Sequence, residues 1–252
     1  MKAILLLVLG MSFIPLNDAL IKVMSQRLPL AEIVAMRAVI SLAILVVFTN
    51  GLRSILALDS RTILLFVLRG MFLVAAMYLY FLALSSLPIS TVVSIFFLSP
   101  LLITALSALF LKEKIGSHRI TAVVLALLGV ALIMRPGTSF FKLEMLLALG
   151  SAISYAIFQV VTRRLKGVGD LPGLITIQHL CYLVSALPLL AYNLTGNWEE
   201  TGNQSVDFLL RQTVFPTFLE CAFFIVCAFA VLFLSFASSY AYRKAEASLI
   251  AP

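Results

Sequence analysis

The sequence predicts an all-α, polytopic membrane protein with eight complete transmembrane helices and a stub of a ninth. Apolar residues make up 62% of its 252 residues, charged residues make up 12%, and the mean hydropathy is +1.12. Apolar segments recur between short polar breaks, and each is apolar on every face over about the 20 residues that a spanning helix needs. The sequence lacks the ten-residue alternating segments that are typical of a transmembrane barrel.

Each apolar segment is expected to be a helix, because a backbone in lipid must satisfy its own hydrogen bonds. Pro88 separates the third and fourth segments by a tight turn. The fifth segment is short, and Arg119 and Arg135 flank it, so that their long side chains can reach the two membrane surfaces. A polar loop, residues 193–215, leads into the eighth segment. The predicted segments are about 3–24, 31–48, 62–84, 89–111, 120–134, 145–161, 173–192 and 214–242, and residues 245–252 are the predicted start of a ninth.

The basic residues predict the orientation of the chain. They stand at segment ends rather than along one solvated face, so the net charge of +7 does not predict a nucleic-acid-binding surface. With the N-terminus in the cytoplasm, eleven basic residues are inside and five outside, as the positive-inside rule favours. We therefore expect a multi-pass protein of a bacterial inner (plasma) membrane with loop 193–215 outside. The inside set is Lys2, Arg53, Arg61, Lys112, Lys114, Arg119, Arg163, Arg164, Lys166, Arg243 and Lys244, and the outside set is Lys22, Arg27, Arg135, Lys142 and Arg211.

A weak internal repeat divides the chain. The segment around Arg37 aligns with residues 171–183, which places Arg37 opposite Gln178, and residues 83–91 align with residues 241–249. A repeat of five helices has an odd number, so the second copy would be inserted upside down. Transporters built from such inverted repeats bind their substrate between the repeats near the membrane midplane. The predicted units are 1–138, with helices one to five, and 139–252, an incomplete copy with helices six to eight and the start of nine.

Three stretches resemble a known family. They are FLKEKIGSHRITAVVLALLGVALIMRPG at residues 110–137, NDALIKVMSQRLPLAEIVAMRA at residues 17–38, and RKAEASLIAP at residues 243–252. Together they resemble the ten-helix EamA branch of the drug/metabolite transporter (DMT) superfamily, over essentially the whole chain. The resemblance implies two inverted five-helix repeats that move amino acids, vitamins or nucleotide-like solutes. Because the family pattern has two further helices, this chain is expected to be an inactive or marginal transporter by itself.

Asp18 and Arg37 are the first candidate site residues. At about 1.5 Å per residue, Asp18 lies roughly 22 Å above the inner end of its helix and Arg37 lies at nearly the same level on the next one. Ionisable groups inside a membrane usually face a partner or a watery cavity. We therefore expect the two residues to meet, as a gate, as a site for a charged part of the substrate, or with Asp18 as a proton carrier. The alternative is a structural ion pair, which could include an i,i+4 contact between Asp18 and Lys22.

A polar stripe forms the second candidate. Ser151, Tyr155 and Gln159 are four residues apart and share a helix face, which can line a cavity or a helix contact. Ser94 continues the same spacing from Ser90 on the fourth segment. Tyr78 completes the predicted substrate site, although packing or the aromatic belt would also explain a tyrosine there. Arg69 is expected to snorkel to the inner headgroups, and His179 to bond between helices. The predicted substrate-binding set is Asp18, Arg37, Tyr78, Ser94, Ser151, Tyr155 and Gln159.

These features favour a secondary-type transporter that carries a small polar or zwitterionic metabolite by alternating access between two inverted repeats. A non-catalytic membrane scaffold or inactive fragment is the alternative. An intramembrane enzyme is disfavoured, because the sequence has neither HExxH nor GxSxG and only one intramembrane aspartate. Its three cysteines lack metal-binding spacing. We expect no catalytic residues, no metal and no cofactor. The expected partners are a small-molecule substrate and the lipid bilayer, without nucleic acid, and a homodimer is left open.

Overall fold

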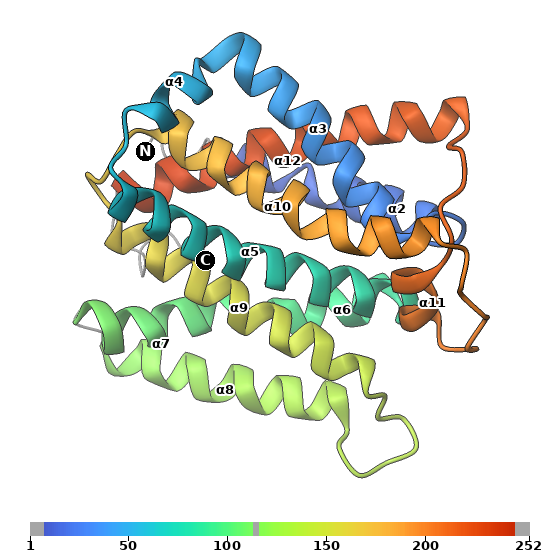
Figure 1. Cartoon of the computed structure of the whole chain (residues 1–252). Helices are drawn as coiled ribbons and strands as arrows, with labels where there is room; N and C mark the ends of the chain where they lie inside the picture. Colours follow the sequence, from blue (N-terminus) through green and yellow to red (C-terminus); the bar gives the residue numbers. More distant parts are fainter. Residues whose placement is uncertain (1–7, 113–115, 245–252) are drawn as a thin grey trace.

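The computed structural model describes residues 8–112 and 116–244, and these residues form helices joined by loops, with no strand among them. The predicted all-α fold is therefore confirmed. The predicted stub at residues 245–252 lies outside the described residues. In chain order, the helices are α2 (Ile14–Met24), α3 (Leu30–Thr49), α4 (Gly51–Leu56), α5 (Ser60–Ser86), α6 (Ile89–Phe96), α7 (Ser99–Leu111), α8 (Ser117–Met134), α9 (Glu144–Arg164), α10 (Leu171–Leu194), α11 (Gln204–Leu210) and α12 (Phe218–Lys244) (Figure 1).

The chain is a multi-pass membrane protein. Within the described ranges, six stretches are long and apolar enough to cross a bilayer, namely α3, α5, α6 with α7, α9, α10 and α12. The apolar stretch His118–Met134 in α8 is shorter, as the sequence predicted for its fifth segment. The predicted first segment is described only from residue 8, and its helix breaks at residues 12–13 before α2. Pro15 lies in the first turn of α2, where a residue without an N–H donor is tolerated.

Local chemistry sets where the helices begin and end. Asp59 caps α5 by accepting a hydrogen bond from the Thr62 backbone N–H at 3.2 Å. Hydrogen bonds from the Thr62 side chain and from this backbone N–H hold the pKa of Asp59 below its ordinary value. Asp170 caps α10 in the same way through Gly173 N–H, at 3.1 Å. Pro100 explains the break between α6 and α7, because it cannot donate the helical hydrogen bond.

The long helices lie side by side (Figure 1). Helix α5 packs along α9, α3 packs along α10, and α7 and α12 also contact α9. Large aromatic side chains fill the contacts between these helices, and Phe66, Phe158 and Phe224 are each at most 2% exposed. The outer face of the bundle is apolar, as a surface in contact with lipid must be.

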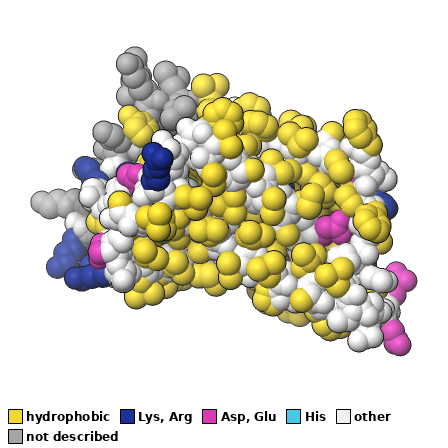
Figure 2. Space-filling view, turned by 45° about the horizontal axis from the view of Figure 1, so that its top comes forward, with side chains coloured by type: hydrophobic (Ala, Val, Ile, Leu, Met, Phe, Trp, Pro, Cys, Tyr) yellow, Lys and Arg dark blue, Asp and Glu magenta, His cyan; other side chains and the backbone are white. Residues whose placement is uncertain are grey.

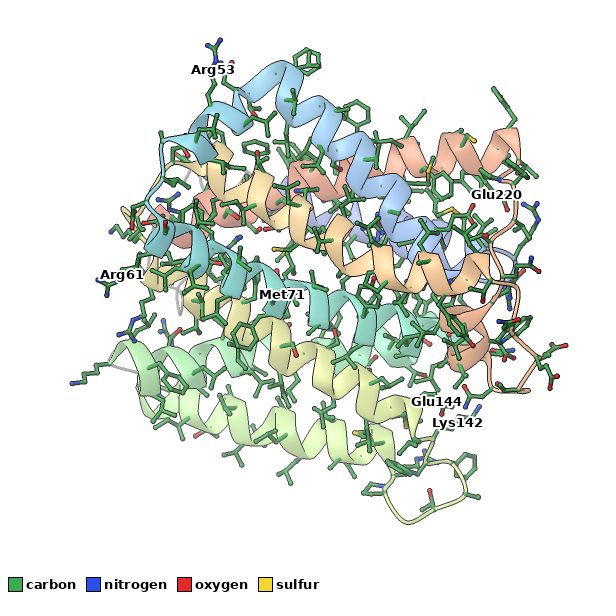
Figure 3. All side chains as sticks on the ribbon, in the orientation of Figure 1. Arg53, Arg61, Met71, Lys142, Glu144 and Glu220 are labelled. Atoms are coloured by element: carbon green, nitrogen blue, oxygen red, sulfur yellow. The ribbon has the colours of Figure 1, made fainter. Side chains whose placement is uncertain are left out.

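The two ends of the bundle differ in charge. Arg53 and Arg61 lie at one end, and Lys142, Glu144 and Glu220 lie at the other (Figure 3). On the face shown in Figure 2, most Lys and Arg side chains gather at the first end, acidic side chains are visible at both ends, and an apolar band lies between. We call these ends the Arg61 end and the α11 end. Among the described residues, the basic set predicted to be inside lies at the Arg61 end, and the set predicted to be outside lies at the α11 end.

The α11 end contains a helix that the sequence analysis placed in a loop. Within residues 193–215, Asn203 caps α11 by accepting hydrogen bonds from the N–H groups of Ser205 and Val206, at 3.0 and 3.2 Å. Phe208 is fully buried on the inner side of this short helix. Its seven residues are too few for a periodicity signal, which is why the pattern did not reveal it.

Candidate functional site

Asp18 lies on α2 with 2% of its surface exposed. Tyr80 Oη on α5 donates a hydrogen bond to Asp18 Oδ2 at 2.6 Å, and Asn17 Nδ2 donates to Oδ1 at 3.3 Å. Arg37 makes no ion pair with it within 4.0 Å, although both residues lie in the described part of the chain. The predicted direct ion pair is therefore wrong. Neutral donors already occupy both carboxylate oxygens, and a shared depth in the membrane does not fix the direction in which a side chain points.

Lys22 does not bond to Asp18 either, which corrects the alternative i,i+4 contact. Its ammonium group donates to the backbone carbonyls of Leu84, Ser85 and Leu87 at 2.6, 2.8 and 3.2 Å. These oxygens stand at the carboxyl end of α5, where a helix leaves carbonyls unpaired and carries a partial negative charge. Lys22 is thus a cap for α5 at the α11 end.

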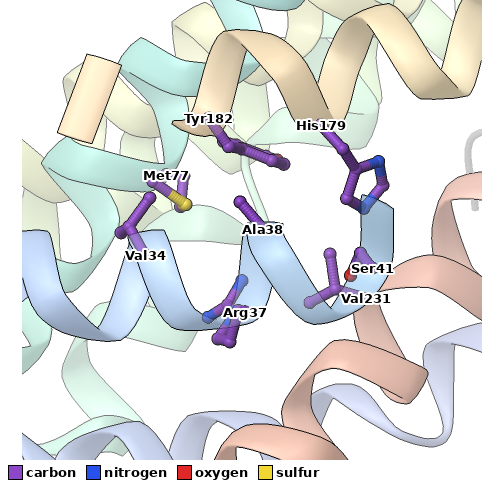
Figure 4. Close-up of a pocket in the computed structure, with 8 residues that line it drawn as sticks. All are labelled: Val34, Arg37, Ala38, Ser41, Met77, His179, Tyr182 and Val231. Atoms are coloured by element: carbon purple, nitrogen blue, oxygen red, sulfur yellow. The ribbon is translucent and has the colours of Figure 1, made fainter. Parts of the chain in front are cut away.

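Arg37 lies on α3 and is 5% exposed. Its guanidinium carbon sits 5.4 Å from the centre of the Phe81 ring, a cation–π distance. Its Nε and Nη1 atoms are buried without any hydrogen-bond partner. Arg37 borders a small cavity between α3, α5, α10 and α12, whose lining is Val34, Arg37, Ala38, Ser41, Met77, His179, Tyr182 and Val231 (Figure 4).

Arg69, the tenth of the 27 residues of α5, is fully buried. Its Nε donates to Thr162 Oγ1 at 2.7 Å, Nη1 donates to Gln178 Oε1 at 2.9 Å, and Nη2 donates to Ser239 Oγ at 2.8 Å. The guanidinium also lies 4.2 Å from the centre of the Phe158 ring. The predicted snorkelling of Arg69 is wrong, because three neutral acceptors on three other helices hold its head inside the bundle.

These contacts make a polar cluster across four helices. Gln178 Nε2 donates onward to Ser235 Oγ at 2.8 Å, so α10 and α12 are joined through the same amide. We call this group the Arg69 cluster, and its members are Arg69, Thr162, Gln178, Ser235 and Ser239, all buried.

The predicted stripe on α9 divides between two roles. Ser151 Oγ donates to the Ala76 carbonyl of α5 at 2.8 Å and is fully buried, which matches the helix-contact alternative. Gln159 Nε2 donates to Tyr155 Oη at 2.6 Å, and Gln159 Oε1 is buried without a partner. The Tyr155 ring packs between Phe96 and Phe158, with ring centres 5.3 and 5.8 Å away. Tyr155 and Gln159 thus form a pair near the Arg69 cluster.

Tyr78 and Ser94 lie apart from these groups. Both are half-buried. Tyr78 precedes Tyr80 by two residues on α5, so it points to a different side of that helix, toward Ser185 of α10. Neither residue is hydrogen-bonded to the described Asp18, Arg37 or Arg69, so the structure does not gather all seven predicted residues into one site.

The described helices α2, α3 and α5 bury charged side chains of both signs. These are the two arginines Arg37 and Arg69 and the two carboxylates Asp18 and Glu32, of which Glu32 lies in the first turn of α3 and accepts from the Val214 N–H at 3.4 Å. Buried charges are costly in a low dielectric unless they are paired. The described residues contain no group of three or more His, Cys, Asp or Glu side chains that could hold a metal.

The first half of the chain matches a known protein family. Residues 1–135, just over half of the chain, match the model of the EamA-like transporter family. The chain belongs to this family. The resemblance drawn from its three sequence stretches is thereby confirmed.

Curated relatives of this EamA-like protein are transporters by name. It is 27% identical over 242 residues to the pseudopaline exporter CntI of Pseudomonas aeruginosa, which covers 95% of this chain and 79% of that protein. It is 25% identical over 238 residues to an S-adenosylmethionine uptake transporter of Rickettsia felis, covering 93% and 78%. It is 28% identical over 164 residues to a riboflavin transporter of Vibrio cholerae, covering 65% of this chain but only 53% of that protein.

A solved crystal structure shares the fold of this EamA-like chain. The TM-score is 0.67 at 19% sequence identity, and the match covers 99% of this chain and 81% of the other. At this identity the likeness concerns the fold alone.

Sequence reasoning missed two residues of this EamA-like protein. The sequence hinted that Arg69 is functional, since an arginine stands inside a 27-residue apolar helix. Its partners could be identified only from the packing of α9, α10 and α12. Nothing in the sequence marked Tyr80 as functional, because a tyrosine in an apolar helix is equally well explained by packing against its neighbours. Its role appears only in the contact with Asp18.

Proposed function

We propose that this protein transports a small polar or zwitterionic metabolite by alternating access between two inverted halves, 1–138 and 139–252. The observation that carries the proposal is the convergence of Arg37 and the Arg69 cluster between α3, α5, α9, α10 and α12. Polar and ionisable groups inside a membrane are costly and mark solute pathways. The riboflavin, S-adenosylmethionine and pseudopaline transporters among the relatives support the same class of function.

The contacts at the α11 end are those of a closed gate. Ser86 and Ser205 hydroxyls lie 2.6 Å apart across α5 and α11, Arg211 Nη1 donates to the Ser25 carbonyl at 3.2 Å, and Arg27 pairs with Glu220. Separate elements meet in each contact, so opening this end requires these bonds to break. Alternating access then exposes the polar core at one end at a time.

We further propose that the N-terminus is cytoplasmic, that the α11 end faces outside, and that the membrane is a bacterial inner membrane. The separation of the basic residues between the two ends supports this orientation. In cells, an impermeant thiol reagent should label a cysteine at position 200 from outside and spare one at position 61. The reverse labelling would contradict the orientation.

Transport is tested with the purified chain in liposomes. The vesicles are placed in an extract of small metabolites, and mass spectrometry identifies solutes that enter them faster than they enter protein-free liposomes. We expect slow but measurable accumulation of at least one small polar solute, because the chain by itself is expected to be a marginal transporter. Equal entry of every solute into both preparations would contradict the proposed function.

A further inference from the structure

Asp18 has partners that can hold its carboxyl group with or without a proton. Tyr80 Oη donates to Oδ2 at 2.6 Å, and this oxygen accepts the bond both in a carboxylate and in a carboxylic acid. At the other oxygen, Asn17 Nδ2 donates to Oδ1 at 3.3 Å, while Asn17 Oδ1 is buried without any donor. A half-turn of the Asn17 amide exchanges its nitrogen and oxygen, so that the oxygen accepts from a proton on Asp18 Oδ1. One rotation therefore adapts the site to either form of Asp18.

The neighbouring helices supply no counterion to Asp18. The titratable and charged groups that face it are Tyr80 on α5, Arg37 on α3 and Cys227 on α12. Lys22, one turn away on α2, donates instead to backbone carbonyls of α5. No cation lies within 4.0 Å of the Asp18 carboxylate in the described chain. Burial of an unpaired carboxylate is costly, and uptake of a proton removes the charge that causes the cost.

The second half of the proposed repeat has a neutral group at the corresponding position. Asp18 lies twelve residues before Leu30, where α3 begins, and Gln159 lies twelve residues before Leu171, where α10 begins. Both side chains are at most 2% exposed, and each bonds to a tyrosine hydroxyl at 2.6 Å. A carboxylic acid and a carboxamide are similar in shape, and each presents a donor side and an acceptor side. The repeat thus sets a titratable side chain in one half against a permanently neutral one in the other.

We propose that Asp18 is the proton-binding site that couples solute transport to the pH difference across the membrane. When one end of the bundle opens, a proton from water is added to Asp18 Oδ1, and the carboxylate becomes a neutral carboxylic acid. When the other end opens, that O–H bond breaks and water accepts the proton. One proton crosses the membrane in each cycle. This inference rests on the proposed alternating access, which brings water to Asp18 from each end in turn.

Infrared spectroscopy detects the proton on Asp18 without any solute. Difference spectra of the full chain in lipid nanodiscs are recorded while the pH is lowered from about 8 to about 5. We expect the C=O band of a protonated, buried carboxyl group to appear in the parent and to be missing from Asp18→Asn. Glu200→Gln, at an exposed site in loop 193–215, is the matched control and should keep the band. Identical spectra of the parent and a folded Asp18→Asn protein would overturn the proposal.

Tyr80→Phe decides the question if Asp18→Asn does not fold. This variant removes the hydrogen bond to Asp18 Oδ2, so we expect the carboxyl band to move to higher frequency. An Asp18 that serves only the fold and never takes a proton gives no band to move. An absent or unmoved band would then overturn the proposal.

Solute accumulation in liposomes tests the coupling itself. The vesicles are placed in the metabolite extract with the outside more acidic and then more alkaline than the inside, and entry into protein-free liposomes is subtracted. A difference of about one pH unit is worth a factor of about ten for one proton, so steady-state accumulation of the transported solute should differ at least about tenfold between the two settings. We expect Asp18→Asn to lose this difference and Glu200→Gln to keep it.

The two measurements separate coupling from transport. Equal accumulation by the parent in the two settings would overturn the coupling and leave the transport function standing. A carboxyl band assigned to Asp18, without entry of any solute, would reject the transport function and the coupling with it, and leave only a site that binds a proton.

Discussion

At the residue scale, Arg69 joins four helices through one side chain, yet none of its partners is charged. A buried charge without a counterion contributes little to stability and is often replaceable by an apolar residue of similar size. Its position inside the apolar helix α5 therefore fits a role in handling a polar solute better than a role in holding the fold.

Arg69→Leu separates those roles. We expect the variant to fold, because no charge is left unpaired and Thr162 Oγ1 still donates to the Phe158 carbonyl. Its free energy of unfolding should fall by about 1–3 kcal/mol, because Gln178 Oε1 and Ser239 Oγ lose their donor. We expect its transport of the solute found with the parent to fall at least about tenfold, which corresponds to about 1.4 kcal/mol. Arg61→Leu, at an exposed site, is the control. Normal transport, or collapse of the fold, would contradict this reading.

Asp18 and Tyr80 form the second residue-scale unit, through their 2.6 Å hydrogen bond. Hydrogen bonds to a charged group contribute about 1.5–3 kcal/mol. In a double-mutant cycle of unfolding free energies, Asp18→Asn and Tyr80→Phe should therefore couple by about 1 kcal/mol or more. The matching cycle of Asp18→Asn with Arg37→Gln should show weaker coupling. The opposite order would mean that Asp18 and Arg37 are the true pair.

At the element scale, the apolar segments could be predicted from the sequence because length and hydropathy alone decide a spanning helix. Residues 89–111 were predicted as one segment, although the break at Pro100 has a local cause, the missing N–H of the proline. Helix α11 could not be predicted, because its seven residues give no periodicity signal. The lysine cap on α5 could not be predicted either, because it joins residues far apart in the chain. The same limit applies to the site: residues of the right type were found, but the pairings of Asp18 with Tyr80 and of Arg69 with Gln178 required the helix packing.

Lys22 links two elements, since it caps the carboxyl end of α5 from α2. Lys22→Met removes three hydrogen bonds and leaves carbonyls of Leu84, Ser85 and Leu87 without this donor. We expect a loss of about 1–3 kcal/mol in the free energy of unfolding. Lys142→Met, an exposed change at the same end, should stay within about 0.5 kcal/mol of the parent. Equal stabilities of the two variants would show that the cap contributes nothing.

At the scale of the whole molecule, the bundle has the buried Arg69 cluster within a mainly hydrophobic core. It also has an apolar band on the face shown in Figure 2, and its two ends differ in charge (Figure 3). The α11 end is closed by contacts that join α2 with α5, α5 with α11, and α11 with α9 through Asn203 and Glu144 at 3.1 Å. On the proposed alternating access, we expect a solute to reach Arg37 or the Arg69 cluster from this end after α11 moves away from α5. The central claim is therefore that movement of α11 against α5 belongs to the transport cycle.

A reversible lock between α5 and α11 tests that claim most directly. Ser86 and Ser205, whose hydroxyl oxygens lie 2.6 Å apart, are both replaced by cysteine after Cys181, Cys221 and Cys227 are changed to alanine. Solute entry into liposomes is then measured on the oxidised and the reduced protein, with each single-cysteine variant as control. We predict that the disulfide reduces entry at least about tenfold and that reduction restores it. Full entry with the disulfide completely formed would contradict the account.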